Sequence, residues 1–330
     1  MAKTVNSAFN IFNQDFVNLD TAETKTARSS RDWLITQLTN LPNKIDDFPR
    51  LYEGMHIKFG SFARNTKIRP LDDIDLILTF SAEGTTYWTH SYGKSYTLTV
   101  PDTATNLKKL CYENSNTLNS IKLVNKLVSS LKEIGHYKSA DIHRRQEAAT
   151  LKLTSYDWNF DIVPAFYTDT GYYLIPDGNG GWKATDPRID QKKVTDVNQK
   201  HNGSILQIIR ILKYWNRRAK MPTIPSYLFE NLILNYFNSE NDISDYIDVN
   251  MIKFWDHLKV AIYYKVDDPK GFQNDLNTLS LDDKKKISEK AEEIYYKGLE
   301  AYKFETEEKD QEKSINKWRE IFGDDFPEYY

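Results

Sequence analysis

The decapeptide LDDIDLILTF at residues 71–80 alternates acidic and apolar side chains with the two-residue period of an extended strand. Successive side chains of a strand point to opposite faces, so Asp73, Asp75 and Ile77 share one face. The other face carries Ile74, Leu76, Leu78 and Phe80. The Cα atoms of the two aspartates then lie about 7 Å apart. The sequence therefore predicts a strand that buries one face and carries two carboxylates on the other.

A third carboxylate is expected on a second strand, NFDIVPAF at residues 159–166. This segment follows ATLKLT across the polar-aromatic SYDW, which predicts a hairpin, and Pro164 is expected to end regular pairing because it has no N–H. Asp161 points away from Phe160 and Ile162. If the two acidic strands are neighbours, three carboxylates converge and can hold two Mg²⁺ ions about 3.5–4 Å apart.

An isolated Asp-x-Asp is more often a solvated strand edge than a metal site, so a functional interpretation of the two aspartates needs support from a second motif. That signal is Gly60-Ser61 in the stretch FGSFARNTKIRP, directly upstream of the acidic strand. A glycine lets the backbone approach a phosphate, and a helix that opens at Ser61 would offer free N–H groups and a hydroxyl to an anion. Gly-Ser alone is equally a simple turn or helix N-cap.

The remaining periodicity divides the chain into two parts. Apolar residues at helical spacing predict helices over 29–41 and 117–134, while the glycines at 178, 180 and 181 predict a hairpin loop. Beyond Asp190 helical patterns replace strand patterns, at residues 204–215, 226–237, 247–264 and, as one long charged helix, 284–318. We therefore predict a mixed α/β region with an N-terminal helix over 1–190 and a helical region over 191–330.

Composition excludes several classes of protein. The 44 Lys and Arg against 47 Asp and Glu give a net charge of −3, which argues against a strong nucleic-acid surface. A single cysteine allows no intramolecular disulfide, and the chain has neither a signal-peptide pattern nor a run of eighteen apolar residues, so we expect a cytoplasmic protein without a membrane contact. Zinc, P-loop and hydrolase motifs are missing from the sequence, and the basic pair Arg144-Arg145 is more often a solvated loop.

Taken in order, the Gly-Ser, the Asp-x-Asp strand and the distant Asp in a strand with Val-Pro resemble the polymerase-β-like nucleotidyltransferases. More narrowly the chain resembles the branch that holds the oligoadenylate synthases, the cyclic GMP–AMP synthase and the bacterial CD-NTases. Asp73 follows Gly60 by thirteen residues, as in that branch, and FDIVPAF matches its third motif through Asp161, Pro164 and Phe166. The resemblance covers most of the chain. It implies an α+β fold, with a polymerase-β-like core of mixed sheet flanked by helices packed against a C-terminal helical lobe.

The resemblance also implies nucleotide contacts. Gly60 and Ser61 would bind phosphates, and RILKYWNRR resembles the helix whose lysine, here Lys213, meets the triphosphate. IPSYLFENLIL resembles the next helix start, where Ser226 is the small polar residue and Tyr227 the ring that stacks on a base. From the residues alone, Lys213 is as readily a snorkelling lysine and Ser226 a helix cap.

The activity that the resemblance implies is the joining of ribonucleoside triphosphates, ATP or also GTP, CTP and UTP, into a cyclic di- or trinucleotide messenger for antiphage defence of the CBASS type. Asp73, Asp75 and Asp161 would bind two Mg²⁺ ions, with Mn²⁺ as an alternative, and Asp161 is the candidate base. Two other functions stay open: nucleotidyl transfer that yields a linear product or modifies RNA or protein, and a catalytically silent nucleotide-binding module. Regulatory or effector proteins of the same defence system are the expected protein partners.

Overall fold

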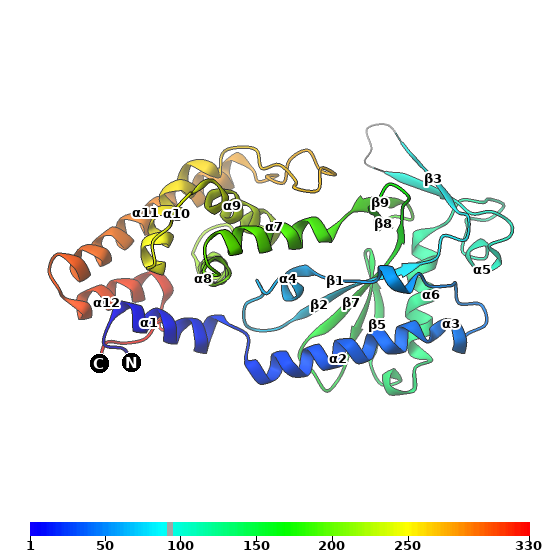
Figure 1. The fold of residues 1–330 in the computed structure, drawn as a ribbon, viewed down its shortest axis with the longest axis horizontal. Coiled ribbons are helices and arrows are strands. Elements are labelled where there is room, and N and C mark those ends of the chain that lie inside the picture. The colour runs from blue at the N-terminus through cyan, green and yellow to red at the C-terminus, as the bar shows by residue number, and fades with distance from the viewer. Residues whose placement is uncertain (91–94) are drawn as a thin grey trace.

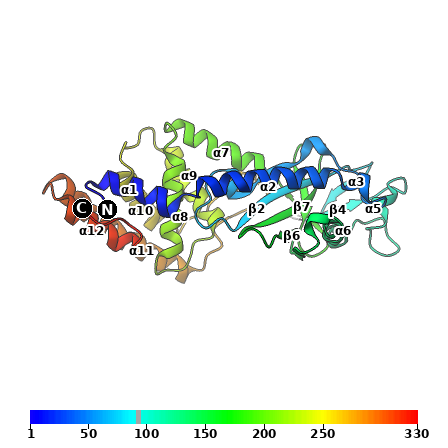
Figure 2. The ribbon, with the colours of Figure 1, turned by 90° about the horizontal axis from the view of Figure 1, so that it is seen from below.

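The computed structural model describes residues 1–90 and 95–330. Figures 1 and 2 show a sheet with its helices at one end of the long axis and a lobe of helices at the other. The α+β architecture predicted from the sequence is confirmed. Among the described residues, no helix combines the length and the apolar character that a membrane crossing requires.

One mixed sheet forms the core of the first part. Seven of its strands follow the order β1-β2-β7-β8-β9-β4-β3, and β6 also pairs with β7 and carries β5 on its other edge. The β2 and β7 strands run parallel, and the other named pairs are antiparallel. The strands are β1 (Ile57–Phe59), β2 (Asp73–Phe80), β3 (Thr86–Thr89), β4 (Tyr96–Thr99), β5 (Asp141–Arg145), β6 (Ala148–Lys152), β7 (Asn159–Tyr167), β8 (Tyr173–Pro176) and β9 (Trp182–Thr185).

The acidic strand predicted at 71–80 is β2, and its two faces differ as expected. Ile74 and Leu76 belong to a large buried cluster with residues of α2 (Thr21–Thr39) and α6 (Ser120–Lys132), the helices that cover this face. The opposite face has only a small apolar cluster around Ile77. The carboxylates of β2 therefore lie on the face that these helices leave open.

Helix boundaries follow the capping side chains. Asp20 begins α2 by accepting a 2.9 Å hydrogen bond from the backbone N–H of Glu23, so the helix begins well before the predicted Ser29. Asn119 begins α6 by accepting a 2.9 Å bond from the N–H of Ile121, within the predicted range 117–134. Such caps each stabilise a helix by about 1 kcal/mol.

The predicted hairpin of β6 and β7 is confirmed, with Leu151 opposite Phe160. The expectation that Pro164 ends regular pairing is wrong, because β7 continues to Tyr167 in register with β2. Pairing with β6 reaches only Ile162 and pairing with β8 begins at Phe166. Pro164 thus stands where β7 changes partners on that edge, and the strand needs no N–H donor there.

One of the helices predicted in the helical lobe is interrupted at a position that the charged sequence pattern did not reveal. The single helix predicted over 284–318 is two helices, because Lys309 has a φ of 55° and Asp310 caps the second helix by accepting from Lys313 N–H. The lobe comprises α7 (Pro187–Lys200), α8 (Ile205–Arg218), α9 (Ser226–Ser239), α10 (Ile247–Ala261), α11 (Leu281–Thr306) and α12 (Gln311–Phe322).

The buried side chains form two large clusters. One joins the sheet to α2 and α6, and the other joins the helical lobe to α1 (Val5–Phe12) and the π-helical turn Asn13–Val17. Phe9 packs edge-on against Trp318, with ring centroids 5.0 Å apart. A division of the chain at residue 190 stays a prediction, and we propose that the first seventeen residues belong with the helical lobe.

The short helical segments lie mostly around the sheet. The loop after β1 forms one helical turn, α4 (Gly60–Ala63), and the glycine-rich loop predicted at 178–181 joins β8 to β9 as expected. The others are α3 (Leu41–Lys44), α5 (Thr105–Lys108) and the 3₁₀ turns Glu53–Met55 and Gly135–Tyr137.

Candidate active site

Gly60 lies against the carboxylate of Asp75. Antiparallel pairing of β1 and β2 sets Phe59 opposite Asp75, and the chain turns directly after Phe59 with a φ of +76° at Gly60. A Cβ added to Gly60 would lie 2.6 Å from Cγ of Asp75 and overlap one of its oxygens. Glycine is therefore required here both by the left-handed backbone and by the close approach of the carboxylate.

The three predicted aspartates occupy neighbouring parallel strands. Asp75 pairs in register with Asp161, while Asp73 pairs with Asn159. Residues in register on adjacent strands lie on the same face about 5 Å apart, so Asp75 and Asp161 are side by side. Asp161 Oδ1 accepts a 2.6 Å hydrogen bond from the hydroxyl of Thr150 on β6, which fixes its orientation.

Electrostatic repulsion among these acids is substantial. Burial, followed by the charges of Asp73 and Asp161, raises the pKa of Asp75 to about 7. Burial also raises the pKa of Asp73, with a contribution from the adjacent Asp72. Three carboxylates in this setting are a donor set that suits a hard divalent cation, which would relieve both the repulsion and the cost of burial.

Lys67 provides part of that positive charge. Its Nζ contacts the carboxylates of both Asp72 and Asp73, and only 13% of the side chain is exposed. Burial lowers the pKa of Lys67, but the charges of Asp73 and Asp72 outweigh it and raise the pKa overall. Within the described part of the chain, no three His, Cys, Asp or Glu side chains form a ready-made metal cluster.

A basic cavity of about 310 Å³ adjoins α4. Three of the predicted nucleotide contacts, Ser61, Lys213 and Ser226, line it. Lys67 and Arg217 line it as well. The backbone oxygen of Ser61 accepts from Thr66 N–H at 2.9 Å, and Ser226 is an exposed first-turn residue of α9 rather than its N-cap.

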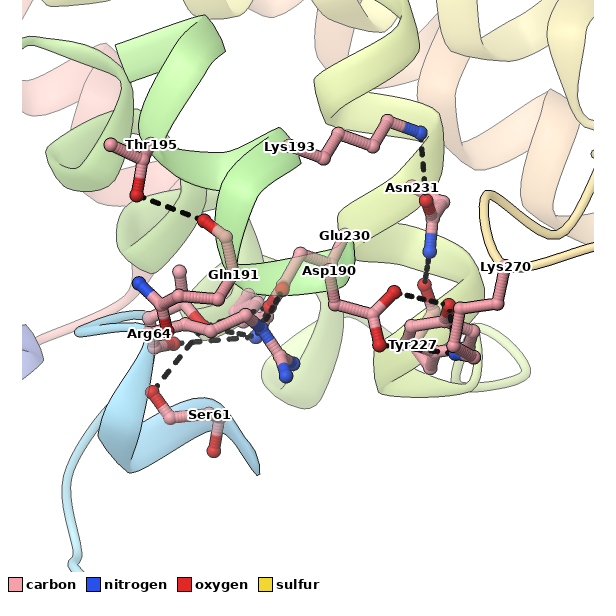
Figure 3. Close-up of polar contacts among 12 residues, drawn as sticks. Ser61, Arg64, Asp190, Gln191, Lys193, Thr195, Tyr227, Glu230, Asn231 and Lys270 are labelled. Atoms are coloured by element: carbon pink, nitrogen blue, oxygen red, sulfur yellow. Dashed lines mark hydrogen bonds and ion pairs between the residues drawn. The ribbon is translucent and has the colours of Figure 1, made fainter. Parts of the chain in front are cut away.

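Lys213 belongs to a buried ionic network at the inner wall of this cavity. Its Nζ contacts Glu230, and it donates at 3.3 Å to both the carbonyl and the hydroxyl oxygen of Thr66. Glu230 also accepts a 2.7 Å bond from Nε of Arg64, as Figure 3 shows. Burial alone would raise the pKa of the Glu230 carboxyl. The charges of Lys213 and Arg64 outweigh burial and lower this pKa to about 2. Two cations against one carboxylate leave this wall net positive.

All three ammonium protons of Lys213 thus have protein acceptors. A phosphate oxygen could bind Lys213 only by taking the place of one of them. The expected contact of Lys213 with a triphosphate stays a prediction.

A second cavity, of about 750 Å³, lies between the sheet and the helical lobe and includes Gly60 and Tyr227 in its lining. The Tyr227 hydroxyl bonds to Asp190 at 2.7 Å and to Lys270 at 2.5 Å, as Figure 3 shows. Lys270 Nζ also lies 4.1 Å from the ring centroid, near the hydroxyl end of the ring. Burial raises the pKa of Tyr227, with Asp190 adding to the shift. The hydrogen bonds of the hydroxyl thus fix the orientation of the ring on which a base would have to stack.

Comparison with known proteins places this arrangement in a family. A domain described as "Second Messenger Oligonucleotide or Dinucleotide Synthetase domain" matches residues 110–198. A "probable cyclic nucleotide synthase" of Bacillus cereus (strain VD146) is 47% identical over 339 aligned positions, which cover 100% of this chain and 99% of the relative. The chain belongs to the CD-NTase family of nucleotidyltransferases. A "Cyclic AMP-AMP-AMP synthase" of an Acinetobacter species is 25% identical over 60% of the chain and 58% of its own length.

Solved structures show the same CD-NTase fold. CdnC of E. coli MS115-1, determined with ATP, superimposes with a TM-score of 0.72 at 16% identity and 98% coverage of both chains. The DncV cyclic AMP-GMP synthase of Vibrio cholerae, in complex with nonhydrolyzable GTP, superimposes with a TM-score of 0.67 at 12% identity, covering 99% of this chain and 97% of DncV. A further structure holds CdnC in complex with HORMA-deltaN.

In this CD-NTase the residues predicted from sequence fall into three adjoining groups: the aspartates on β2 and β7, the cavity lined by Ser61, and the cavity lined by Tyr227. Sequence reasoning missed Lys67 and Arg217. Lys67 stands six residues before Asp73 in a polar loop, and that proximity was the one available signal. Arg217 follows Lys213 by one helical turn, which predicts a shared helix face.

Proposed function

We propose that this protein joins ribonucleoside triphosphates into a cyclic oligonucleotide and releases pyrophosphate. One observation carries the proposal: Asp75 and Asp161 lie in register on parallel strands, with Gly60 held against the Asp75 carboxylate. A simple nucleotide binder gains nothing from three mutually repelling acids, whereas phosphoryl transfer uses them. Membership of the CD-NTase family supports the cyclic product.

Two Mg²⁺ ions, or Mn²⁺ in their place, would be held by Asp73, Asp75 and Asp161. Bound there, they supply Lewis-acid stabilisation of the charge on the attacking and leaving oxygens. The fit rests on the donor set and on the raised pKa of Asp75, since both favour a bound cation.

The protein's own side chains would orient the substrates. Asp161, oriented by the 2.6 Å bond from Thr150, would accept the proton of the acceptor ribose hydroxyl. Ser61, Lys67 and Arg217 line the cavity that we assign to the donor triphosphate.

The remaining predicted contacts act at the edges of this arrangement. Lys213 lines the same cavity and Arg64 lines the neighbouring one, and together they outnumber Glu230, which favours an anion nearby. Ser226 would add a hydroxyl at the cavity mouth, and the ring of Tyr227 would stack on a base.

The biological setting follows from the family. We propose that the product is a second messenger of CBASS-type antiphage defence, made in the cytoplasm. A HORMA-type protein is a candidate regulator, because the similar CdnC has been solved in complex with one. ATP is the first substrate to test, since CdnC was solved with ATP and the Acinetobacter relative is named for AMP units.

The test is incubation of the purified protein with each of the four NTPs, singly and mixed, with Mg²⁺ or Mn²⁺. We expect pyrophosphate release and a product that resists phosphatase, identified by mass spectrometry. Asp75→Asn should abolish both while the protein stays folded. Asp102→Asn, which changes an exposed loop aspartate paired with Lys108, is the matched control and should keep full activity.

Two outcomes distinguish the other functions. A product that loses phosphate on phosphatase treatment identifies a linear oligonucleotide synthase, because a cyclic product has no terminal phosphate. Saturable NTP binding without turnover by the wild-type protein in either metal identifies a silent binding module and contradicts the proposal.

A further inference from the structure

A third polar cavity lies at the junction of α2, α4 and α8, beside the cavity lined by Ser61, with which it shares Lys67. Its volume is about 190 Å³, and Asn18, Arg28, Asn65, Lys67 and Arg210 line it. Lys67 is already paired with Asp72 and Asp73, so the positive charge available in the cavity comes from Arg28 and Arg210. The two arginines present this charge without a carboxylate in the cavity lining.

Arg210 is the most constrained of these cations. Nε donates to Oδ1 of Asn18 at 2.6 Å, and Nη1 donates to the backbone oxygen of Asn65 at 2.8 Å. Both acceptors are neutral. Burial alone lowers the pKa of Arg210, and no carboxylate among the described residues opposes that shift. A half-buried guanidinium with neutral partners gains from an anion.

Arg28 reaches the same cavity from α2. Nη2 donates to Oδ1 of Asn65 at 3.2 Å, so both arginines are bound to one residue. Asn65 has a φ of 58°, and this left-handed turn presents its side chain to Arg28 and its carbonyl to Arg210. Asn65 thus links the two guanidinium groups at one end of the cavity, where both can donate to a tetrahedral oxyanion.

We propose that this cavity binds a small phosphate anion, inorganic phosphate or pyrophosphate, between Arg28 and Arg210. Its volume is several times the share of one water molecule in the liquid, about 30 Å³, yet it is below the range of about 300–1,000 Å³ typical of pockets for larger ligands. Size and charge together favour a small polyanion over a whole nucleotide. The proposal does not depend on the catalytic function, since the two arginines line neither of the cavities assigned to the nucleotide.

The test is isothermal titration of the nucleotide-free protein with inorganic phosphate and with pyrophosphate, in separate arms, in the absence of divalent ions. We expect saturable binding by the wild-type protein. The arm with the lower Kd identifies the anion that fits better.

Two variants locate the site. Arg28→Gln changes an exposed side chain and should weaken binding about tenfold, the loss expected for one charge-assisted hydrogen bond. Arg50→Gln, which removes the charge of an exposed arginine that lines neither this cavity nor the one lined by Ser61, is the matched control and should leave the Kd within about twofold. Arg210→Gln should abolish binding if circular dichroism shows that the variant folds.

Three results would overturn the proposal. These are the lack of saturable binding of either anion by the wild-type protein, an unchanged Kd in Arg28→Gln, or a loss in Arg50→Gln as large as that in Arg28→Gln. The last result would show that the anion responds to general surface charge and not to this cavity.

Discussion

Replacement of Gly60 by alanine should lower the catalytic rate strongly and the stability of the fold only modestly. The new Cβ would lie 2.6 Å from Cγ of Asp75, where ordinary contact begins at 3.4 Å, so the carboxylate must retreat by roughly 1 Å. A displacement of that size at a reacting centre costs about 100-fold in rate. The backbone conformation adds a separate cost of about 1–2 kcal/mol in stability, because alanine is strained at a φ of +76°.

Gly203→Ala is the matched control. Gly203 has a φ of +88°, and an added Cβ there meets nothing within 4 Å. It therefore carries a similar backbone strain without any contact with Asp75. Thermal unfolding should show comparable losses of stability for the two variants. Pyrophosphate release under saturating NTP, measured at a temperature where both variants are folded, should fall about 100-fold only in Gly60→Ala.

The geometric reasoning fails if Gly60→Ala retains activity within about threefold of the wild type, a change too small for a displaced metal ligand. It fails equally if Gly203→Ala loses as much activity as Gly60→Ala, since the loss would then reflect strain alone.

Three further predictions follow from the ionic contacts of the site. Lys67→Met should tighten Mn²⁺ binding to the nucleotide-free protein about tenfold, measured by electron paramagnetic resonance, because Asp73 loses its competing cation; unchanged affinity would contradict the competition. Glu230→Gln should destabilise the fold by about 3–5 kcal/mol in chemical denaturation, because two buried cations lose their carboxylate. The folded-state pKa of Glu230 is depressed from 4.5 to about 2, so its ionisation contributes about 3 kcal/mol to the free energy of unfolding above pH 4.5. This contribution is lost as the pH falls toward 2, and Glu230→Gln should not show that loss. Tyr227→Phe keeps the ring and should leave the KM for NTP within about twofold. Tyr227→Ala should raise the KM by the equivalent of about 1–3 kcal/mol of base stacking. Equal effects of the two variants would exclude stacking.

Local patterns in the sequence predicted the elements that carry the acids. The alternation in LDDIDLILTF specified a strand and assigned Asp73 and Asp75 to one face, because the two-residue period admits no other arrangement with one face buried. The register of Asp75 with Asp161 lay beyond that reasoning. It depends on a parallel pairing between strands more than eighty residues apart, and only the family resemblance suggested it.

Contacts between distant segments account for what the sequence did not predict. The sequence around Lys213 suggested a snorkelling lysine whose ammonium group reaches water. Its ammonium group is instead buried and paired with Glu230, which comes from another helix. The first helix precedes the sheet in the chain yet packs with the last helix, since the apolar face of Phe9 and Phe12 fits the rings of α12. The break before Asp310 was hidden because the residues on both sides keep a charged helical pattern.

Glu230 has a consequence for how mutational data on this protein are interpreted. It lies on α9 in the helical lobe, where it contacts Lys213, and it accepts a hydrogen bond from Arg64 beside the Gly-Ser turn. A single carboxylate therefore links the helical lobe to the sheet beside the triphosphate cavity. Loss of turnover in a Lys213 variant could therefore come from a missing substrate contact or from a weakened contact between the helical lobe and the sheet. A substitution that keeps the positive charge beside Glu230, such as Lys213→Arg, separates the two causes by its effect on KM at constant stability.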